Sequence, residues 1–428
     1  MNERIIVVGG GAGGLELAVR LGRKYKRRKN VEVMLIDKNP THIWKPLFHE
    51  VATGSLNSYH DEASYLMLAR KHKFNFVLGR VTTIDSDARS VTIDALTDDD
   101  VEIVPEREFR FDTLVVAVGA LSNDFGIPGV REFSRYLDSR EQAERFHKHF
   151  ATQLQRTNLA STSETLTVGI VGGGATGVEL AADMHNVVQR LREYGFEHFG
   201  KERLSVTLVE AAPELLPRLP ERIGVSVREE LGRIGVAVRV DTRVSEVRKD
   251  CVVTSEGEEI PAQISVWAAG VRAPEWLETC GLPVDKLGRV EVNDDLTVKD
   301  RPGVFAIGDC AAARNSDGSE IPPRAQAAHQ MATVAAKNIV AQRRGKRMRA
   351  FKYRDFGSLV SLSKYSTVGN LMGNLVRGTI FVEGWIARLV YLSLYRMHQA
   401  TVHGRFSTLL IMLGDRIYKA TRAEVKLH

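Results

Sequence analysis

The chain contains one short pattern twice: an apolar run, a cluster of glycines and then a helix-like segment. The two copies are RIIVVGGGAGGLEL over Arg4–Leu17 and TVGIVGGGATGVEL over Thr167–Leu180. A strand followed by Gly-x-Gly-x-x-Gly and a helix is typical of domains that bind a dinucleotide. The glycines allow a tight turn and a close approach of a pyrophosphate to the N–H groups that begin the helix. The repeat therefore predicts two copies of one supersecondary unit.

Five further apolar runs extend this pattern into a fold. Each glycine cluster is followed by a run that an acid closes, Val31–Asp37 in the first copy and Ser205–Glu210 in the second. Later runs end in glycine or in Gly-Asp: Thr113–Gly119, Ser265–Gly270 and Gly303–Asp309. Apolar strands that alternate with helices are typical of parallel sheets covered on both faces. The prediction is an α/β fold with two Rossmann-like dinucleotide-binding domains, the second inserted in the first.

The predicted domain bounds follow from these runs. We expect the first domain over residues 1–120 and 290–345, the second over 160–285, and a C-terminal unit over 350–428. In the C-terminal unit, apolar side chains recur at helical spacing, at Phe406, Leu409, Leu410, Leu413 and Ile417. This stripe fits the core of a C-terminal domain, a dimer interface, or a helix that lies in a membrane surface.

Charge and composition exclude several classes of protein. The net charge is +6, and most of the excess lies in the C-terminal unit. A basic surface fits nucleic acid or anionic lipid, but the chain shows no nucleic-acid-binding motif and no interleaved aromatic residues. We expect no membrane-spanning segment, because no run reaches about 20 apolar residues. We also expect no signal peptide, no metal site and a reduced state for Cys251, Cys280 and Cys310, which are far apart in sequence.

The first glycine cluster predicts a site for the pyrophosphate of a dinucleotide. Its residues are Gly9, Gly10, Gly11, Ala12, Gly13 and Gly14. Asp37 ends the following strand, where a carboxylate can accept hydrogen bonds from ribose hydroxyls. The second cluster repeats the arrangement with Gly172, Gly174, Ala175, Thr176 and Gly177, and Glu210 is the matching acid. Because a carboxylate repels a 2′-phosphate, we expect NADH rather than NADPH at this site; the alternative for Glu210 is an ordinary strand-end acid.

Two dinucleotide sites in one chain indicate a flavin paired with an exchanging nicotinamide. Gly308-Asp309 follows a predicted strand and fits a contact with the ribityl phosphate, although a plain turn has the same sequence. Glu179 falls in the first turn of the second helix. It either contacts the nicotinamide half or handles a proton, or it is an acid that favours a helix N-terminus. Lys45 is expected near the flavin or its entrance.

The segment Arg324–Ala332, RAQAAHQMA, predicts a helix with a neutral polar face. Gln326 and Gln330 are four residues apart and share that face. Their amides could hydrogen-bond the carbonyl groups of a quinone, while the alanines allow a flat ligand to approach. A helix packed on small residues is the alternative. His329 between them is either a structural histidine or part of a proton relay.

Together these motifs resemble the two-dinucleotide-binding-domain flavoproteins, and more narrowly the bacterial type II NADH dehydrogenases. The segments that carry the resemblance are VVGGGAGGLEL, HIWKPLFHEVATGSL, IVGGGATGVELAAD, VWAAGV, FAIGDCA, PPRAQAAHQMA and FGSLVSLS. They span essentially the whole chain. The resemblance implies a single-subunit NADH:quinone oxidoreductase that does not pump protons. The alternatives that remain are a soluble FAD-dependent NADH oxidase or reductase, and a non-catalytic NAD(H)-binding membrane protein.

The resemblance also implies roles for residues. Non-covalent FAD would be held by the first glycine cluster and Asp37, with Lys45, Val81, Ala117, Gly308, Asp309, Ala325 and Gln326. NADH would be held by the second cluster and by Glu179, Glu210, Ala269 and Gly270. Gln326 and Gln330 would meet the quinone, and Glu179, Gln326 and Gln330 would serve catalysis.

The expected partners are a membrane quinone (ubiquinone or menaquinone), an anionic lipid surface and a second copy of the chain, without nucleic acid. The C-terminal unit would dock the protein on the cytoplasmic face of the bacterial inner membrane. Disulfide reductases and sulfide:quinone oxidoreductases of this superfamily use a pair of cysteines near the flavin, and the three cysteines here do not supply one.

Overall fold

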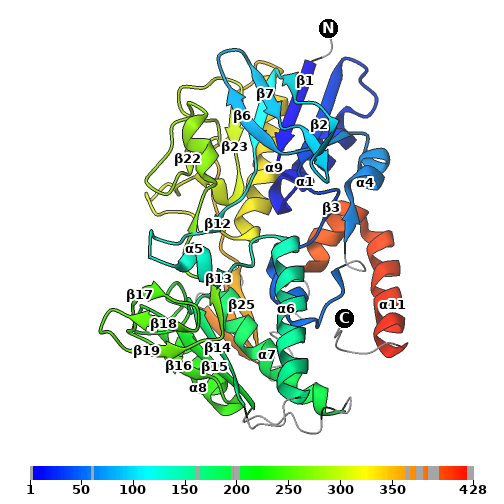
Figure 1. The fold of residues 1–428 in the computed structure, drawn as a ribbon. Coiled ribbons are helices and arrows are strands. Elements are labelled where there is room, and N and C mark those ends of the chain that lie inside the picture. Colours follow the sequence, from blue (N-terminus) through cyan, green and yellow to red (C-terminus); the bar gives the residue numbers. More distant parts are fainter. Residues whose placement is uncertain are drawn as a thin grey trace.

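The computed structural model describes residues 3–58, 62–159, 164–193, 196, 203–362, 366–372, 379–383 and 395–421. Two parallel five-stranded sheets dominate it, and they lie one above the other in Figure 1. The strand orders are β23-β11-β1-β2-β5 in the first sheet and β13-β20-β14-β15-β16 in the second. The predicted α/β fold with two parallel sheets is confirmed, and strands of the first sheet precede and follow the second sheet in sequence.

The first sheet is built around its most apolar strand. Its strands are β1 (Glu3–Val8), β2 (Val31–Asp37), β5 (Asn75–Leu78), β11 (Thr113–Val116) and β23 (Val304–Ala306). Ile5, Ile6 and Val7 are fully buried because β1 pairs on both edges and helices cover the sheet. Helix α1 (Ala12–Tyr25) follows β1 and packs against α9 (Ala325–Gln342). The two turns that precede α1 and α9 therefore lie at the same end of the sheet.

The second sheet repeats this order of elements. It contains β13 (Ser134–Arg135), β14 (Leu166–Val171), β15 (Leu204–Val209), β16 (Ala237–Arg239) and β20 (Ile264–Trp267). Helices α7 (Ala175–Glu193) and α8 (Glu221–Ile234) follow β14 and β15. As in the first domain, the glycine turn leads from the central strand into the next helix.

The packing around the second sheet begins earlier in the sequence than the predicted bound of residue 160. Helix α6 (Arg140–Leu159) places Phe146, Phe150 and Leu154 in the core of this domain. At the other end, Ala273 and Leu277 pack with strands of the first domain, although the predicted second domain extends to residue 285. The apolar periodicity does not change where the chain passes from one domain to the other, so the sequence does not predict these bounds. The two connections pair as β12 (Leu121–Ser122) and β21 (Val271–Arg272).

Small antiparallel sheets complete the two domains. Strands β6 (Val81–Asp85), β7 (Ser90–Ile93) and β10 (Arg107–Arg110) form one, and β17 (Val244–Val247), β18 (Cys251–Thr254) and β19 (Glu259–Pro261) form another. The two-stranded pairs are β3 (Thr41–His42) with β4 (Ala63–Ser64), β8 (Leu96–Asp98) with β9 (Val101–Val104), and β22 (Val290–Glu291) with β24 (Ala311–Ala312). Short helices α2 (Phe48–Thr53), α4 (Tyr65–His72) and α5 (Val130–Phe133) lie in the connections.

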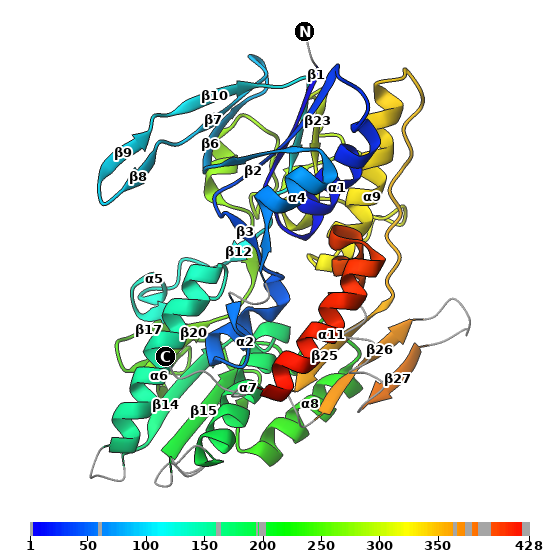
Figure 2. The same ribbon diagram turned by 90° about the vertical axis from the view of Figure 1, so that its right-hand side faces the viewer.

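The C-terminal unit lies beside both domains (Figure 2). Strands β25 (Gly357–Leu362), β26 (Ser366–Met372) and β27 (Thr379–Glu383) form an antiparallel sheet that contacts α7 and α8. A helical segment over 395–403 precedes α11 (Arg405–Thr421). The helix predicted from the apolar stripe is present, although the side chain of Ile417 lies outside the described residues. Within the described parts of the chain, no helix is long and apolar enough to cross a membrane.

Candidate functional site

One large cavity lies between the two domains. Its volume is about 2150 Å³, and residues of both glycine clusters line it. Most of the predicted site residues share this wall: Gly9, Gly11, Ala12, Gly13, Asp37, Lys45, Ala117, Gly172, Gly174, Ala175, Thr176, Glu179, Glu210, Ala269, Gly270, Gly308, Asp309, Ala325, Gln326 and Gln330. Gly10, Gly14, Val81 and Gly177 are buried and do not line it. The fold thus brings both predicted dinucleotide turns and the two glutamines to one space.

The first glycine turn has the shape that a pyrophosphate requires. Gly9 has φ of +100°, and a Cβ there would collide with the carbonyl of Ala117. A Cβ on Gly14 would collide with the carbonyl oxygen of Gly9, so α1 approaches the strand too closely for any side chain. A Cβ on Gly11 would meet nothing within 4 Å. The turn is therefore closed toward the sheet and open toward the cavity, which fits a ligand phosphate on the N-terminus of α1.

The second glycine turn repeats these constraints. Gly172 has φ of +115° and faces the backbone of Ala268, and a Cβ on Gly177 would collide with the carbonyl oxygen of Gly172. Gly174 has open space around its Cβ position. The same physical reasons for glycine therefore apply in both halves, and the second turn also fits a dinucleotide.

The two strand-end acids hold the two turns in the same way. Oδ2 of Asp37 accepts a hydrogen bond from the backbone N–H of Gly10 at 2.6 Å, and Oδ1 accepts one from Asn39 at 2.8 Å. Oε2 of Glu210 accepts from the N–H of Gly173 at 2.6 Å, and Oε1 accepts from Ala212 at 2.8 Å. Both carboxylates line the cavity beside these backbone contacts. Burial raises the pKa of Asp37, although these hydrogen bonds oppose the shift.

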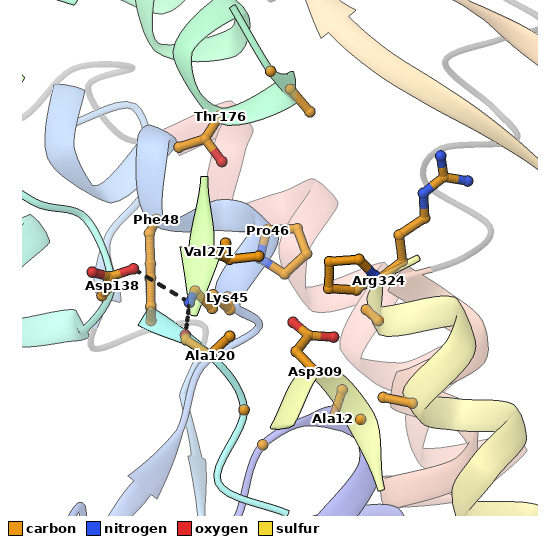
Figure 3. Close-up of a pocket in the computed structure, with 18 of the residues that line it drawn as sticks. Ala12, Lys45, Pro46, Phe48, Ala120, Asp138, Thr176, Val271, Asp309 and Arg324 are labelled. Atoms are coloured by element: carbon orange, nitrogen blue, oxygen red, sulfur yellow. Dashed lines mark hydrogen bonds and ion pairs between the residues drawn. The ribbon is translucent and has the colours of Figure 1, made fainter. Parts of the chain in front are cut away.

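A lysine and two aspartates, Lys45, Asp138 and Asp309, are among the residues that line the cavity. Lys45 donates from Nζ to the carbonyl of Ala120 at 2.8 Å and lies 3.5 Å from Oδ1 of Asp138 (Figure 3). Asp309 follows β23, and Figure 3 shows it facing the same cavity as Lys45 and Arg324. Burial raises the pKa of Asp309, and the charge of Lys45 opposes that shift. A half-buried carboxylate at this point fits a polyhydroxylated ligand chain that donates hydrogen bonds.

The two glutamines of α9 are bound to the segment that leads into the C-terminal unit. Oε1 of Gln326 accepts from the hydroxyl of Tyr353 at 2.7 Å and from the N–H of Phe356 at 3.2 Å. Gln330 pairs with the backbone of Arg354 through both ends of its amide, at 2.8 and 3.0 Å. The predicted shared face of the helix is present, and its amides also fix one wall of the cavity.

Glu179 lies in a buried cluster that joins the two domains. Its Oε2 is 3.5 Å from Nδ1 of His49, and Nε2 of the same ring is 3.5 Å from Oδ2 of Asp183. His49 belongs to α2 of the first domain, whereas both acids belong to α7 of the second. Burial lowers the pKa of His49. The sequence motifs assign no role to His49, so its pairing with Glu179 and Asp183 is a feature that sequence reasoning missed.

The sequence singles out only His329 in a second buried cluster, because the cluster joins residues far apart in the chain. Glu16 of α1 is fully buried, and its Oε1 accepts a hydrogen bond from Nδ1 of His398 at 2.9 Å. Its Oε2 lies 2.6 Å from Nδ1 of His329. Nε2 of His398 is 3.0 Å from Nε2 of His42, whose Nδ1 donates to the carbonyl of Gly10 at 3.0 Å. Glu16 and His398 are 382 residues apart in the chain, and no sequence motif predicts that they are in contact.

The cysteines do not form a redox pair. Cys251, Cys280 and Cys310 are all free thiols in the structure. Cys310 is fully buried beside Asp309, and burial raises the pKa of its thiol to about 12. Among the described residues, no group of three or more His, Cys, Asp or Glu side chains is arranged to hold a metal ion.

Comparison with known proteins places the chain in a family. Residues 3–332 match the model of the family described as pyridine nucleotide-disulphide oxidoreductase, so the chain belongs to that family. It is 39% identical over 443 residues to the type II NADH:quinone oxidoreductase of Haemophilus influenzae, with all of both chains covered. It is 28% identical over 425 residues to the corresponding protein Ndh of Mycobacterium tuberculosis, with 96% and 87% covered. Within the wider family, the chain is a type II NADH:quinone oxidoreductase.

Solved structures agree with the fold. NDH2 from Plasmodium falciparum in complex with NADH has a TM-score of 0.83 at 18% identity, with all of both chains covered. The sulfide:quinone oxidoreductase of Aquifex aeolicus has a TM-score of 0.72 at 19% identity, with 94% of this chain and 92% of that chain covered. At such identities the likeness shows the fold alone.

Proposed function

We propose that the protein is a respiratory NADH:quinone oxidoreductase that uses non-covalent FAD and works at the cytoplasmic face of a bacterial inner membrane. Membership of the type II enzymes gives the overall reaction, NADH and a quinone to NAD⁺ and a quinol. The observation that carries the proposal is the cavity between the two domains, because it joins two dinucleotide turns and the glutamine face of α9. The non-pumping character rests on the family resemblance.

The first domain would hold FAD. The open backbone at Gly11 would receive the pyrophosphate, Asp37 would meet ribose hydroxyls, and Asp309 with Lys45 would contact the ribityl and ring region. The wall formed by Ala117, Gly308 and Ala325 leaves room for a flat ring because its side chains are small. When bound, the flavin accepts hydride from the nicotinamide and returns two electrons to the quinone.

The second domain would hold NADH. Gly174, Ala175 and Thr176 would receive its pyrophosphate at the start of α7, and the carboxylate of Glu210 would accept hydrogen bonds from an unmodified ribose. A 2′-phosphate at the same place would lie beside that carboxylate and would be repelled. Ala269 and Gly270 follow β20 and line the cavity, where their small size would allow the nicotinamide half to pass between the domains.

Glu179 would act where the two domains meet. It is 5% exposed, and His49 lies between it and Asp183. A carboxylate held in this way can orient the nicotinamide half or accept and release a proton beside it. Gln326 and Gln330 would bind the quinone head group on the other side, since neutral amides hydrogen-bond carbonyl oxygens without adding charge.

The assay that tests this proposal compares electron acceptors for one purified preparation with added FAD. A short-chain quinone is expected to support fast NADH oxidation, and oxygen alone is expected to support little. Rapid oxidation with oxygen and none with quinone would favour a soluble NADH oxidase instead. NADH binding without turnover on any acceptor would favour a non-catalytic binding protein.

A further inference from the structure

The buried cluster around Glu16 connects three parts of the chain and opens on the cavity. Glu16 comes from α1, His329 from α9 and His398 from the helical segment over 395–403. All three residues line the cavity, and His329 is the most accessible, with 26% of its side chain exposed. Gln326 and Gln330 flank His329 on the same helix. The cluster therefore reaches the place proposed for the quinone head group.

The hydrogen bonds fix where the protons of this cluster lie. A carbonyl oxygen only accepts, so Nδ1 of His42 carries a hydrogen and donates it to Gly10. Burial lowers the pKa of His42 to about 3, so this ring is neutral and its Nε2 is an acceptor. The ring of His398 must then donate from Nε2 to His42. Its Nδ1 lies 2.9 Å from Oε1 of Glu16, so this ring connects His42 with the carboxylate.

Glu16 is the ionised carboxylate of this cluster. Burial alone would raise its pKa, but the imidazoles of His329 and His398 outweigh burial and lower the pKa to about 2. Nδ1 of His329 lies 2.6 Å from Oε2 of this carboxylate, in an ion-pair contact. Among the residues that the structure describes, Nε2 of His329 has no hydrogen-bonding partner, and it is the nitrogen left for a ligand.

We propose that His329 gives the quinone the proton that is drawn from solution, and that Glu16 and His398 are positioning residues for it. The inference rests on the proposed function. Reduction of a quinone to a quinol adds two electrons and two protons. NADH supplies both electrons and one proton, so one further proton is needed in each turnover. Nε2–H of protonated His329 passes to a quinone oxygen, the ring becomes neutral, and the next proton enters from the water of the cavity.

The surroundings of His329 fit this role electrostatically. Glu16 is the acid in contact with it, and Arg20 lies 3.5 Å from the same Oε2. Asp309 faces the cavity from the neighbouring turn, and Arg324 at the start of α9 is paired with Asp355 at 3.2 Å. Glu16 thus fixes the ring orientation, as a carboxylate does behind a catalytic histidine.

The test uses two acceptors with the same FAD-loaded protein. Ferricyanide takes up electrons without protons, whereas a short-chain quinone needs both. His329→Gln is expected to lower the kcat with quinone by about 100-fold, the usual contribution of a general acid. The ferricyanide rate, the flavin content and the melting temperature are expected to stay close to wild type. His149→Gln, at a histidine of α6 outside the cavity wall, is the matched control and should change neither rate.

Two further readouts separate a proton donor from a structural residue. Added imidazole should restore quinone reduction to His329→Ala. In wild type, the quinone rate should fall as pH rises, because quinone reduction consumes a proton. In Glu16→Gln the quinone rate should fall while the ferricyanide rate stays, because the carboxylate that orients the ring is gone.

Three results would overturn the inference. One is an equal loss of both rates in His329→Gln, and another is an unchanged pH profile in this variant while Glu179→Gln removes the pH dependence. The third is a quinone rate in His329→Gln that equals wild type. A wild-type protein that reduces ferricyanide but no quinone would instead overturn the proposed function itself, and this inference with it.

Discussion

At the scale of single residues, Asp37 and Glu210 show how one acid serves two purposes. Asp37 ends β2 and Glu210 directly follows β15, and each accepts hydrogen bonds from the glycine turn and from the residue two positions onward. The sequence predicts their positions and a ribose contact. It does not predict the contact with the turn, because the N–H that each acid binds lies 27 or 37 residues earlier in the chain.

Replacing Glu210 should therefore change the choice of nucleotide. Glu210→Gln removes the negative charge and weakens a charge-assisted hydrogen bond worth about 1.5–3 kcal/mol, so KM for NADH should rise about 10-fold or more. KM for NADPH should fall, because the repulsion of its 2′-phosphate is relieved. Steady-state kinetics with both nucleotides measures the change, and Glu229→Gln on the exposed side of α8 is the control. An unchanged ratio between the nucleotides would remove Glu210 from the NADH site.

The cysteines give a second prediction at this scale. Burial raises the pKa of Cys310 to about 12, so at pH 8 its thiol is protonated as well as inaccessible. N-ethylmaleimide should label Cys251 first, since this residue is partly exposed, and should reach Cys310 only after unfolding. Mass spectrometry of the labelled protein follows the order. Activity should survive the exchange Cys251→Ser, and early labelling of Cys310 with loss of activity would point to a redox thiol.

At the scale of elements, histidines attach the helical segment over 395–403 to the first domain. His42 contacts His398, and His72 of α4 lies 2.6 Å from the carbonyl of Val402. Burial lowers the pKa of His42 to about 3 and, with the charge of Arg23, lowers that of His72 to about 4. The sequence predicts the first domain and the C-terminal unit over separate ranges, and no local pattern predicts a contact between them.

Acid should therefore loosen this segment. In the unfolded chain these histidines take up protons near pH 6.5, whereas His42 in the folded chain stays neutral down to about pH 3. The contribution of these histidines to the free energy of unfolding is therefore fully present above pH 6.5. It falls as the pH decreases, by about 1.4 kcal/mol per pH unit for each proton that only the unfolded chain binds. When the pH is lowered from 7 to 5, the hydrogen exchange of residues 395–403 should rise steeply in wild type. The pH dependence should be weaker in His42→Gln and unchanged in His149→Gln; equal slopes in all three would contradict this account.

At the scale of the whole molecule, the sequence predicts the two domains but not how they meet. The glycine repeat and the strand runs predict both sheets because each is local. The contact of His49 with Asp183, the pairing of β12 with β21 and the burial of α6 against the second sheet depend on the arrangement of the domains. Gln326 and both glycine turns line one cavity only because of the fold. The sequence therefore predicts the candidate residues, and the structure shows that they are close together.

The outer face of the molecule gives a prediction about lipid. Helix α11 exposes Phe406, Leu409, Leu410 and Leu413, each by more than half of its surface, and α4 beside it exposes Leu66 and Met67 in the same way. Such a face, in a chain with net charge +6, fits the surface of an anionic membrane.

Flotation with vesicles that contain anionic lipid measures this binding. Leu409→Ser combined with Leu413→Ser should reduce the bound fraction at least 10-fold, since each apolar side chain contributes about 1.5–3 kcal/mol when buried. The rate with a water-soluble quinone should remain. Equal flotation of variant and wild type would show that α11 is not the docking surface, and a change in oligomeric state instead would mark this face as a dimer interface.

The central claim is that one chain passes electrons from NADH to a quinone through a flavin in the interdomain cavity. An anaerobic absorption spectrum of the FAD-loaded protein tests it most directly. The flavin bands should bleach when NADH is added and return when a short-chain quinone follows. Bleaching without recovery by quinone, or flavin bands that NADH leaves unchanged, would contradict the account.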